Sequence, residues 1–259
     1  MFTTGFTLAV TFAIILIAMF LLWILSVVRH NAAIVDPFWG AGFALVAWAA
    51  FLMHWPSAPR TTLLCVLTTV WGLRLSLFLL WRNWGTTEDR RYAAMRSHHG
   101  ANFWWISLFT VFLLQAFLLW FISLPVQIAI CSNRASPLGV LDALGLCFWI
   151  VGMFFETTAD WQLARFKRDP QNASKVLDRG VWRYSRHPNY FGDFCVWWGI
   201  YLIAAAGGAW STLLSPLVMS ILLMKVSGVP LLESTVVDRR PEYADYQSRT
   251  NAFFPGPPK

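Results

Sequence analysis

Residues 179–193 bring basic, aromatic, amide and acidic side chains together in one short run, Arg-Gly-Val-Trp-Arg-Tyr-Ser-Arg-His-Pro-Asn-Tyr-Phe-Gly-Asp. Pro188 has no N–H donor and disfavours helix at His187, which predicts a loop followed by a helix from about Asn189. A helix N-terminus beside arginines attracts anions. The run, called the motif loop below, therefore indicates an anion site at a membrane surface. The alternative is a plain interfacial anchor of arginines and aromatic residues.

A second charged group precedes the motif loop. Glu156 and Asp160 are four residues apart, which places them on one face of a helix. With Arg165 and Lys167 they form either a salt-bridged lock or a nucleotide site, in which acids bind sugar hydroxyls and bases bind phosphates. The sequence has no Gly-rich nucleotide fingerprint, no Walker motif and no H-E-x-x-H pattern. A nucleotide would therefore be bound outside the usual nucleotide folds.

Several ionisable residues lie inside apolar segments, where a charge is costly and usually faces a cavity or a partner. Asp36 and Arg74 come from adjacent predicted helices. They either form a structural ion pair or jointly hold a substrate oxygen. Asp193 follows Asn189 by four residues, so both side chains point the same way.

The composition is that of a polytopic membrane protein. Of 259 residues, 57% are hydrophobic and only 13% are charged, against about 25% charged in soluble domains. Several apolar runs approach the ~20 residues that span a bilayer. The net charge of +7 then reflects basic cytoplasmic loops rather than nucleic-acid binding. The four cysteines are widely spaced, which predicts free thiols and no metal site.

We expect an all-α fold of seven transmembrane helices in a single integral membrane domain, 1–259. The helices are expected at about 5–28, 33–54, 60–82, 102–124, 138–163, 189–206 and 210–231, followed by a tail, 232–259. The first helix is expected to be retained rather than cleaved. Lys and Arg concentrate in 29–32, 83–101, 164–188 and the tail, which predicts an external N-terminus and a cytoplasmic C-terminus. The aromatic-rich tail is expected to fold back over the motif loop.

At these residues a resemblance emerges. The run from Gly180 to Gly192, with Glu156-x-x-x-Asp160 before it and the tail pattern Pro-Glu-Tyr-x-x-Tyr-Gln-x-Arg-Thr after it, resembles a bacterial branch of the steroid 5-alpha-reductase family. The likeness covers most of the chain and is strongest over 150–258. It implies a membrane reductase that takes hydride from NADPH. The implied substrate is a lipophilic enone, such as a 3-oxo-4-ene steroid, that enters from the bilayer.

The resemblance assigns roles to single residues. Asp160 corresponds to an acid near the ribose and amide end of the cofactor, and Lys167 to a base near its phosphates. Tyr184, Asn189 and Tyr246 match family residues, while Asp193 stands where the family has a Glu. The sequence departs from the family on the second and third helices. There the steroid reductases use a Gln-Glu pair and a Tyr to polarise the ketone, and this chain offers Asp36, Trp71 and Arg74.

The expected mechanism places Arg74 and a protonated Asp36 beside the developing enolate oxygen. The candidate catalytic residues are Asp36, Arg74 and Glu156. The candidate NADPH-binding residues are Asp160, Arg165, Lys167, Arg183, Tyr184, Arg186, His187, Asn189, Tyr190, Asp193, Arg239, Tyr243 and Tyr246. The enzyme is expected to be a monomer in a bacterial inner membrane, in contact with membrane lipid, with its cofactor site facing the cytoplasm.

Two other interpretations stay open. The Arg-His-Pro-x-Tyr signature is similar to that of membrane methyltransferases such as isoprenylcysteine carboxyl methyltransferase. In that family a His and a downstream Glu hold S-adenosylmethionine, parts that His187 and Glu233 would play here. The basic cluster of Arg165, Lys167 and Arg168 favours a phosphate-bearing cofactor instead. The third interpretation is a lipid-binding membrane protein without enzymatic activity.

Overall fold

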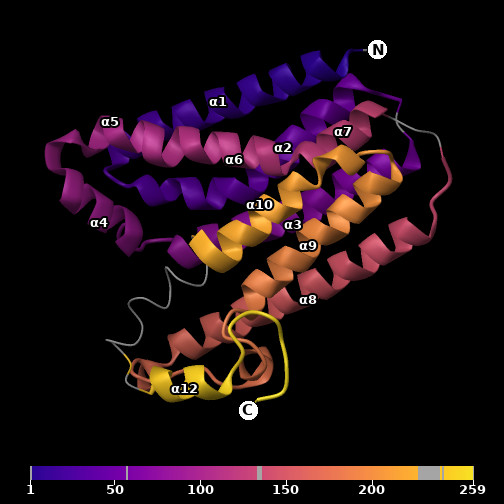
Figure 1. The fold of residues 1–259 in the computed structure, drawn as a ribbon. Coiled ribbons are helices and arrows are strands. Elements are labelled where there is room, and N and C mark those ends of the chain that lie inside the picture. The colour runs from indigo at the N-terminus through magenta and orange to yellow at the C-terminus, as the bar shows by residue number, and fades with distance from the viewer. Residues whose placement is uncertain (1, 57, 133–135, 227–239, 241, 259) are drawn as a thin grey trace. The chain divides into compact units, whose positions relative to one another are not determined.

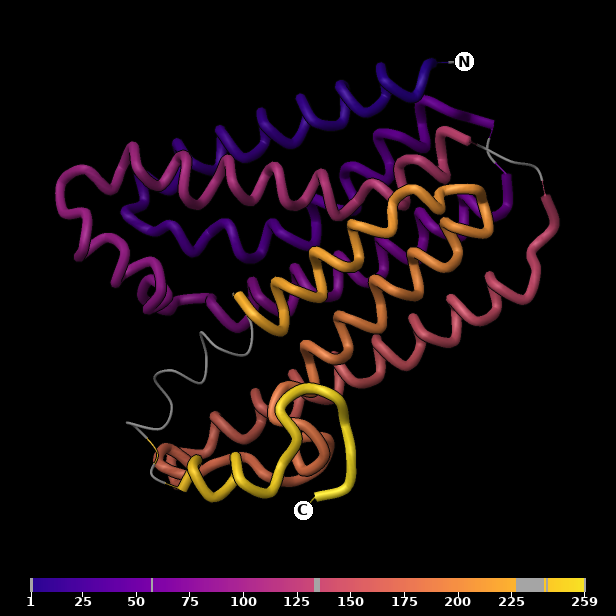
Figure 2. The backbone as a smooth tube through the Cα atoms, viewed as in Figure 1, coloured from indigo at the N-terminus to yellow at the C-terminus, as the bar shows by residue number. Residues whose placement is uncertain are grey.

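The computed structural model describes residues 2–56, 58–132, 136–226, 240 and 242–258 (Figures 1 and 2). Within these ranges the chain forms helices, turns and bends but no β-strand, which confirms the all-α prediction. The chain divides into two compact units. Unit 1 comprises Met1–Leu138 and Ala204–Thr212, and unit 2 comprises Gly139–Ile203 and Leu213–Lys259.

The first helices of unit 1 lie close to their predicted bounds. They are α1 (Thr4–Arg29), the short 3₁₀ helix η1 (Ala32–Ile34), α2 (Val35–Met53) and α3 (Pro59–Asn83). The Thr3 hydroxyl caps α1 by accepting the N–H of Phe6 at 3.3 Å. His30 ends α1 in the left-handed conformation, at φ 49°. Pro59 begins α3, where its missing N–H costs nothing.

The sequence predicts no helix between those at 60–82 and 102–124, and this is wrong because α4 (Arg90–His99) lies there. The Asp89 carboxylate caps this helix by accepting the N–H of Arg91 at 2.9 Å. The segment continues through η2 (Gly100–Asn102), α5 (Phe103–Ser107), the π-helical η3 (Leu108–Leu113) and α6 (Leu114–Ile122). After it comes α7 (Leu124–Ser132). The predicted helix at 102–124 is thus the later part of a longer helical segment.

Unit 2 is built on α8 (Val140–Arg168), which runs further than the predicted 138–163. The short helices η4 (Pro170–Asn172) and η5 (Gly180–Arg183) follow. Next come α9 (Pro188–Ala206), whose last residues belong to unit 1, and η6 (Trp210–Thr212) of unit 1. The chain then forms α10 (Leu214–Ile221), the π-helical η7 (Leu222–Val226) and α12 (Tyr243–Arg249). The end of the predicted helix 210–231 lies outside the described residues.

Five described helical segments are long and apolar enough to cross a membrane, namely Thr4–Arg29, Ala32–Met53, Pro59–Asn83, Arg90–Ile122 and Val140–Arg168. Their outward faces carry large apolar side chains, such as Ile17 and Phe154, which are exposed by 61% and 58%. Exposed apolar surface on long helices is what contact with lipid requires. The chain is therefore consistent with an integral membrane protein.

Candidate functional site

The motif loop in unit 2 is held by the C-terminal tail, as predicted. The Ser185 hydroxyl donates to the carbonyl of Phe253 at 2.7 Å. The backbone N–H of Arg186 donates to the carbonyl of Asn251 at 2.9 Å, and that of Gly256 donates to the carbonyl of Tyr184 at 3.0 Å. Two of these bonds are donated by the motif loop and one by the tail. They fix the loop without using any of its exposed side chains.

Three predicted cofactor-binding residues contribute to this attachment. The Arg186 guanidinium donates to the carbonyls of Gln247 and Thr250 at 3.0 and 2.9 Å. The Tyr246 hydroxyl donates to the carbonyl of Trp182, and Tyr243 packs against Tyr246 with the ring centroids 5.7 Å apart. Both tyrosines are buried. These contacts hold the motif loop against the tail. The sequence analysis predicts that the same three side chains bind NADPH.

Helices α8 and α9 cross closely beside Glu156 and Asp160 of α8. A Cβ atom on Gly192 would lie 2.6 Å from the carbonyl oxygen of Gly152 and 2.5 Å from the backbone nitrogen of Glu156. Only glycine fits such an approach. The crossing buries Glu156 and Asp160, which are 3% and 6% exposed. The buried acids thus face the start of α9.

Asn189 meets Asp160 at this crossing. Its side-chain nitrogen lies 3.4 Å from Oδ1 of Asp160, a long hydrogen bond between α9 and α8. His187 lies two residues before Asn189. Its ring stacks on that of Tyr190, with the ring centroids 5.7 Å apart and an angle of 6° between the ring planes. His187 is buried, whereas Asn189, Tyr190 and Asp193 are partly exposed. The structure therefore assembles acid, amide and imidazole groups at one place.

Apart from Arg186 and His187, the described basic candidates of unit 2 are exposed. Arg165, Lys167 and Arg183 are exposed, as is Tyr184 at 45%. The Arg165 guanidinium lies 5.5 Å from the ring centroid of Trp161. Arg239, and the Glu233 of the methyltransferase hypothesis, lie outside the described residues.

Asp36 in unit 1 has partners that the sequence analysis did not foresee. Its carboxylate accepts hydrogen bonds from the Arg91 guanidinium at 2.8 Å and from the Tyr92 hydroxyl at 2.7 Å. The Asp36 side chain thus uses both of its oxygens as acceptors. The Arg74 guanidinium lies 5.5 Å from the ring centroid of Phe78. The ion pair proposed between Asp36 and Arg74 is replaced by one with Arg91.

Tyr92 is the functional candidate that sequence reasoning missed. It is buried on α4, and the side-chain nitrogen of Gln115 donates to its hydroxyl at 3.3 Å. Its phenol thus lies between an acid and an amide. The N-cap Asp89 followed by a run of helix-forming residues was the signal for α4, and with it for Tyr92.

Glu88, which precedes α4, connects this helix to the segment between α1 and α2 through hydrogen bonds. Its carboxylate accepts hydrogen bonds from Nε and Nη2 of Arg96, each at 2.8 Å, and from the backbone N–H of Ala32 at 2.6 Å. Burial alone raises the pKa of the Glu88 carboxyl, but the hydrogen bonds from Arg96 and Ala32 outweigh it and hold the pKa below its ordinary value. Glu88 is therefore ionised at neutral pH.

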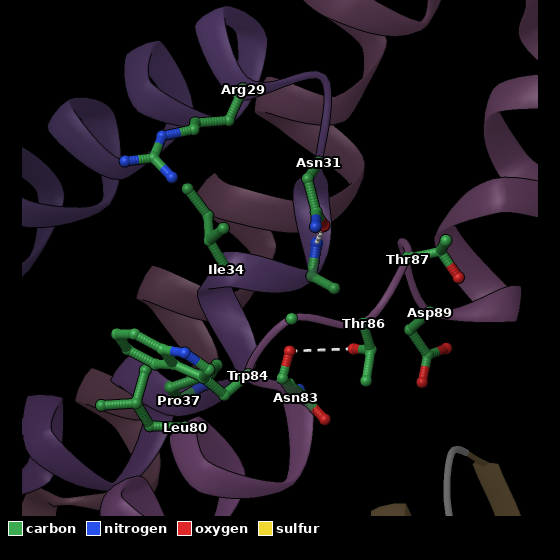
Figure 3. A pocket seen from close by; sticks show the side chains of 12 residues that line it. Arg29, Asn31, Ile34, Pro37, Leu80, Asn83, Trp84, Thr86, Thr87 and Asp89 are labelled. Carbon is green, nitrogen blue, oxygen red and sulfur yellow. Dashed lines mark hydrogen bonds between the residues drawn. The ribbon is translucent and has the colours of Figure 1, made fainter.

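A pocket of about 500 Å³ lies beside these contacts in unit 1, within the size range of small-molecule sites (Figure 3). It is lined by Arg29, Asn31, Ala33, Ile34, Pro37, Leu80, Asn83, Trp84, Gly85, Thr86, Thr87 and Asp89. The lining residues come from the end of α1, the start of α2, the end of α3 and the segment before α4. Asp36 and Tyr92 are not among them.

Comparison with known proteins places the chain in a family. The sequence profile described as a protein of unknown function (DUF1295) matches residues 22–250. The chain belongs to this family. It is 25% identical to the uncharacterized protein C594.04c of Schizosaccharomyces pombe, over 90% of this chain and 75% of the relative. No solved structure matches.

The DUF1295 match contains every candidate site residue, from Asp36 near its start to Tyr246 near its end. The family's shared region thus includes the motif loop. It also includes Asp36 and its partners Arg91 and Tyr92. Among the residues that the structure describes, no group of three His, Cys, Asp or Glu side chains is placed to hold a metal ion.

Proposed function

We propose that this DUF1295 protein is an NADPH-dependent membrane reductase, of the steroid 5-alpha-reductase type, that reduces the carbon–carbon double bond of a lipophilic enone. The observation that carries the proposal is the contact between Asn189 and Asp160 at the α8–α9 crossing. These are two of the residues to which the resemblance gives a cofactor role. They come from separate helices, and their meeting is what that role requires.

The residues of unit 2 fit a nucleotide that carries phosphates. Asp160 and Asn189 offer an acceptor and a donor to ribose hydroxyls or to an amide. Arg165 and Lys167 lie five and seven residues beyond Asp160 on the same helix and are exposed. Guanidinium and ammonium groups bind phosphate oxygens strongly. When bound, NADPH supplies the hydride for the reduction.

Unit 1 offers the groups that a ketone oxygen needs. In the proposed mechanism the Tyr92 hydroxyl turns from Asp36 to the substrate oxygen and donates a hydrogen bond as negative charge develops there. Such preorganised donors lower the barrier to enolate formation. The Arg91 guanidinium, 5.4 Å from the centroid of the Tyr92 ring, keeps the ring in place. Tyr92 takes the part assigned from the sequence to a protonated Asp36. Glu156 and Arg74 remain candidates for a supporting electrostatic role.

The proposal also specifies how many times the chain crosses the membrane and in which orientation. The predicted helices 189–206 and 210–231, the second of which ends outside the described residues, would complete a set of seven spans. The N-terminus would lie outside, and the motif loop and C-terminus in the cytoplasm of a bacterium. The lysine and arginine bias supports this orientation. A flat apolar substrate would reach such a site from the bilayer.

Cofactor titration of the full-length protein purified in detergent tests the proposal. NADPH and S-adenosylmethionine are added separately, and binding is followed by calorimetry. Turnover is then measured as NADPH absorbance loss with a 3-oxo-4-ene steroid. Saturable NADPH binding that Asp160→Asn weakens about tenfold is expected, since a hydrogen bond to a charged group contributes ~1.5–3 kcal/mol. The matched control is Asp169→Asn, because Asp169 is an exposed acid that caps η4.

The methyltransferase hypothesis is the main competitor, because His187 is buried at the α9 start as a cofactor-holding imidazole would be. Binding of S-adenosylmethionine without NADPH would refute the reductase. Binding of neither compound would favour the lipid-binding protein.

A further inference from the structure

The pocket of unit 1 is richer in donors than in acceptors. Arg29 is exposed and has no ion-pair or hydrogen-bond partner within the described part of the chain. Thr87 likewise forms no side-chain hydrogen bond there. The side-chain oxygens of Asn31 and Asn83 already accept from Ala33 and Arg82, so their amide nitrogens are left to donate. A ligand that only accepts hydrogen bonds would satisfy these groups.

The carboxylate in the pocket is already compensated. Asp89 accepts from the backbone N–H and the guanidinium of Arg91, each at 2.9 Å. Burial raises the pKa of the Asp89 carboxyl, but the hydrogen bonds from Arg91 outweigh it and keep the pKa below its ordinary value. Arg91 also pairs with Asp36, and the nearby charge of Arg82 adds to the stabilisation of the Asp89 carboxylate. The two carboxylates thus share two arginines, while Arg29 adds a third positive charge at the pocket. The pocket thus favours an anion.

The wall opposite the polar residues is apolar. Pro37, Leu80 and Trp84 lie together on one side of the pocket, and Thr86, Thr87 and Asp89 lie on the other (Figure 3). Trp84 is 77% exposed. The pocket lies where three membrane-length helical segments end or begin, at Arg29, Ala32 and Asn83. Exposed tryptophan beside arginine at helix ends is typical of the headgroup level of a bilayer.

We propose that this pocket binds the phosphate headgroup of a membrane phospholipid. Arg29 pairs with the phosphate, with the amides of Asn31 and Asn83 and the Thr87 hydroxyl as further donors. The glycerol backbone and the first acyl carbons pack on Leu80 and Trp84. Asp36 and Tyr92 do not line the pocket, so the proposed reaction groups lie outside it, next to Pro37 and Asp89 of its wall.

The site is tested by ligand-induced thermal stabilisation of the delipidated full-length protein in detergent. Dioleoyl phosphatidylglycerol is compared with dioleoylglycerol, which lacks the phosphate, with glycerol 3-phosphate, which lacks the chains, and with NADPH. The variants are Arg29→Gln and Thr87→Trp, the second of which fills the pocket while leaving Arg29 in place. The control is Arg90→Gln, which removes an exposed arginine outside the pocket that has no partner among the described residues.

The expected result is saturable stabilisation by phosphatidylglycerol alone. Arg29→Gln should weaken the apparent affinity about tenfold, as for loss of a charge-assisted hydrogen bond, and Thr87→Trp should abolish the effect. Arg90→Gln should change it less than twofold. Equal stabilisation by dioleoylglycerol would overturn the phosphate contact, and equal stabilisation by glycerol 3-phosphate would overturn the lipid in favour of a soluble phosphate ester. An NADPH effect that Arg29→Gln removes would overturn the separation from the cofactor site.

Discussion

Tyr92 and Asp36, which are 56 residues apart in sequence, join α4 to α2 through a hydrogen bond of 2.7 Å between the phenol and the carboxylate. The Arg91 guanidinium donates a hydrogen bond to the other carboxylate oxygen of Asp36. An acid is therefore held between a phenol donor and a cation. The phenol has one proton to donate, so it can serve a substrate carbonyl only after it turns away from Asp36.

Tyr92→Phe should lower kcat/KM about 10²-fold, the usual effect of removing one oxyanion donor, with NADPH affinity unchanged. The reason is that the hydroxyl acts on the substrate oxygen, whereas the ring still fills its buried place. Steady-state kinetics with the enone, together with NADPH titration, measures this. Normal turnover by the variant would remove Tyr92 from the mechanism.

Arg165→Ala and Lys167→Ala should weaken NADPH more than NADH, because both bases are proposed to bind the 2′-phosphate that only NADPH carries. A several-fold difference is expected from the loss of one charge-assisted contact. Parallel binding titrations with the two cofactors measure it. Lys175→Ala, at an exposed lysine beyond η4, serves as the control. Equal weakening of both cofactors would contradict the assignment.

Glu88 should make stability fall at acid pH. Its pKa in the folded protein lies below the ordinary 4.5, so its contribution is complete above pH 4.5 and is lost as the pH falls through the lower folded value. In Glu88→Gln this loss disappears, because the amide does not titrate. Melting temperatures of both proteins between pH 7 and pH 3 should converge toward the acid end. Parallel curves would show that Glu88 is not the titrating group.

Gly192→Ala should destabilise the protein by about 1–3 kcal/mol, the usual cost of overpacking. The added methyl group would meet the backbone of Gly152 and Glu156. Thermal unfolding in detergent measures the loss. Gly5→Ala is the control, since a Cβ there meets nothing within 4 Å and alanine suits a helix better. If both variants unfold alike, the close crossing does not limit stability.

Sequence patterns predicted the long apolar helices within a few residues, because twenty consecutive apolar side chains leave little choice in a membrane. They missed α4, whose buried side is the single residue Tyr92. The partners of Asp36 were missed for the same reason, since they lie on that helix. Within unit 2, the sequence predicted that the tail folds over the motif loop but not that Arg186 and Tyr246 join the two.

The attachment of the tail also sets an order of events during synthesis. The hydrogen bond of Ser185 can form only after a residue 68 positions later has been synthesised. The two bonds of the Arg186 guanidinium need residues 61 and 64 positions later. All the long apolar helices can therefore enter a membrane before the motif loop has its final support. A premature stop codon just before Tyr243 would yield a chain that is inserted, yet unable to shape the loop.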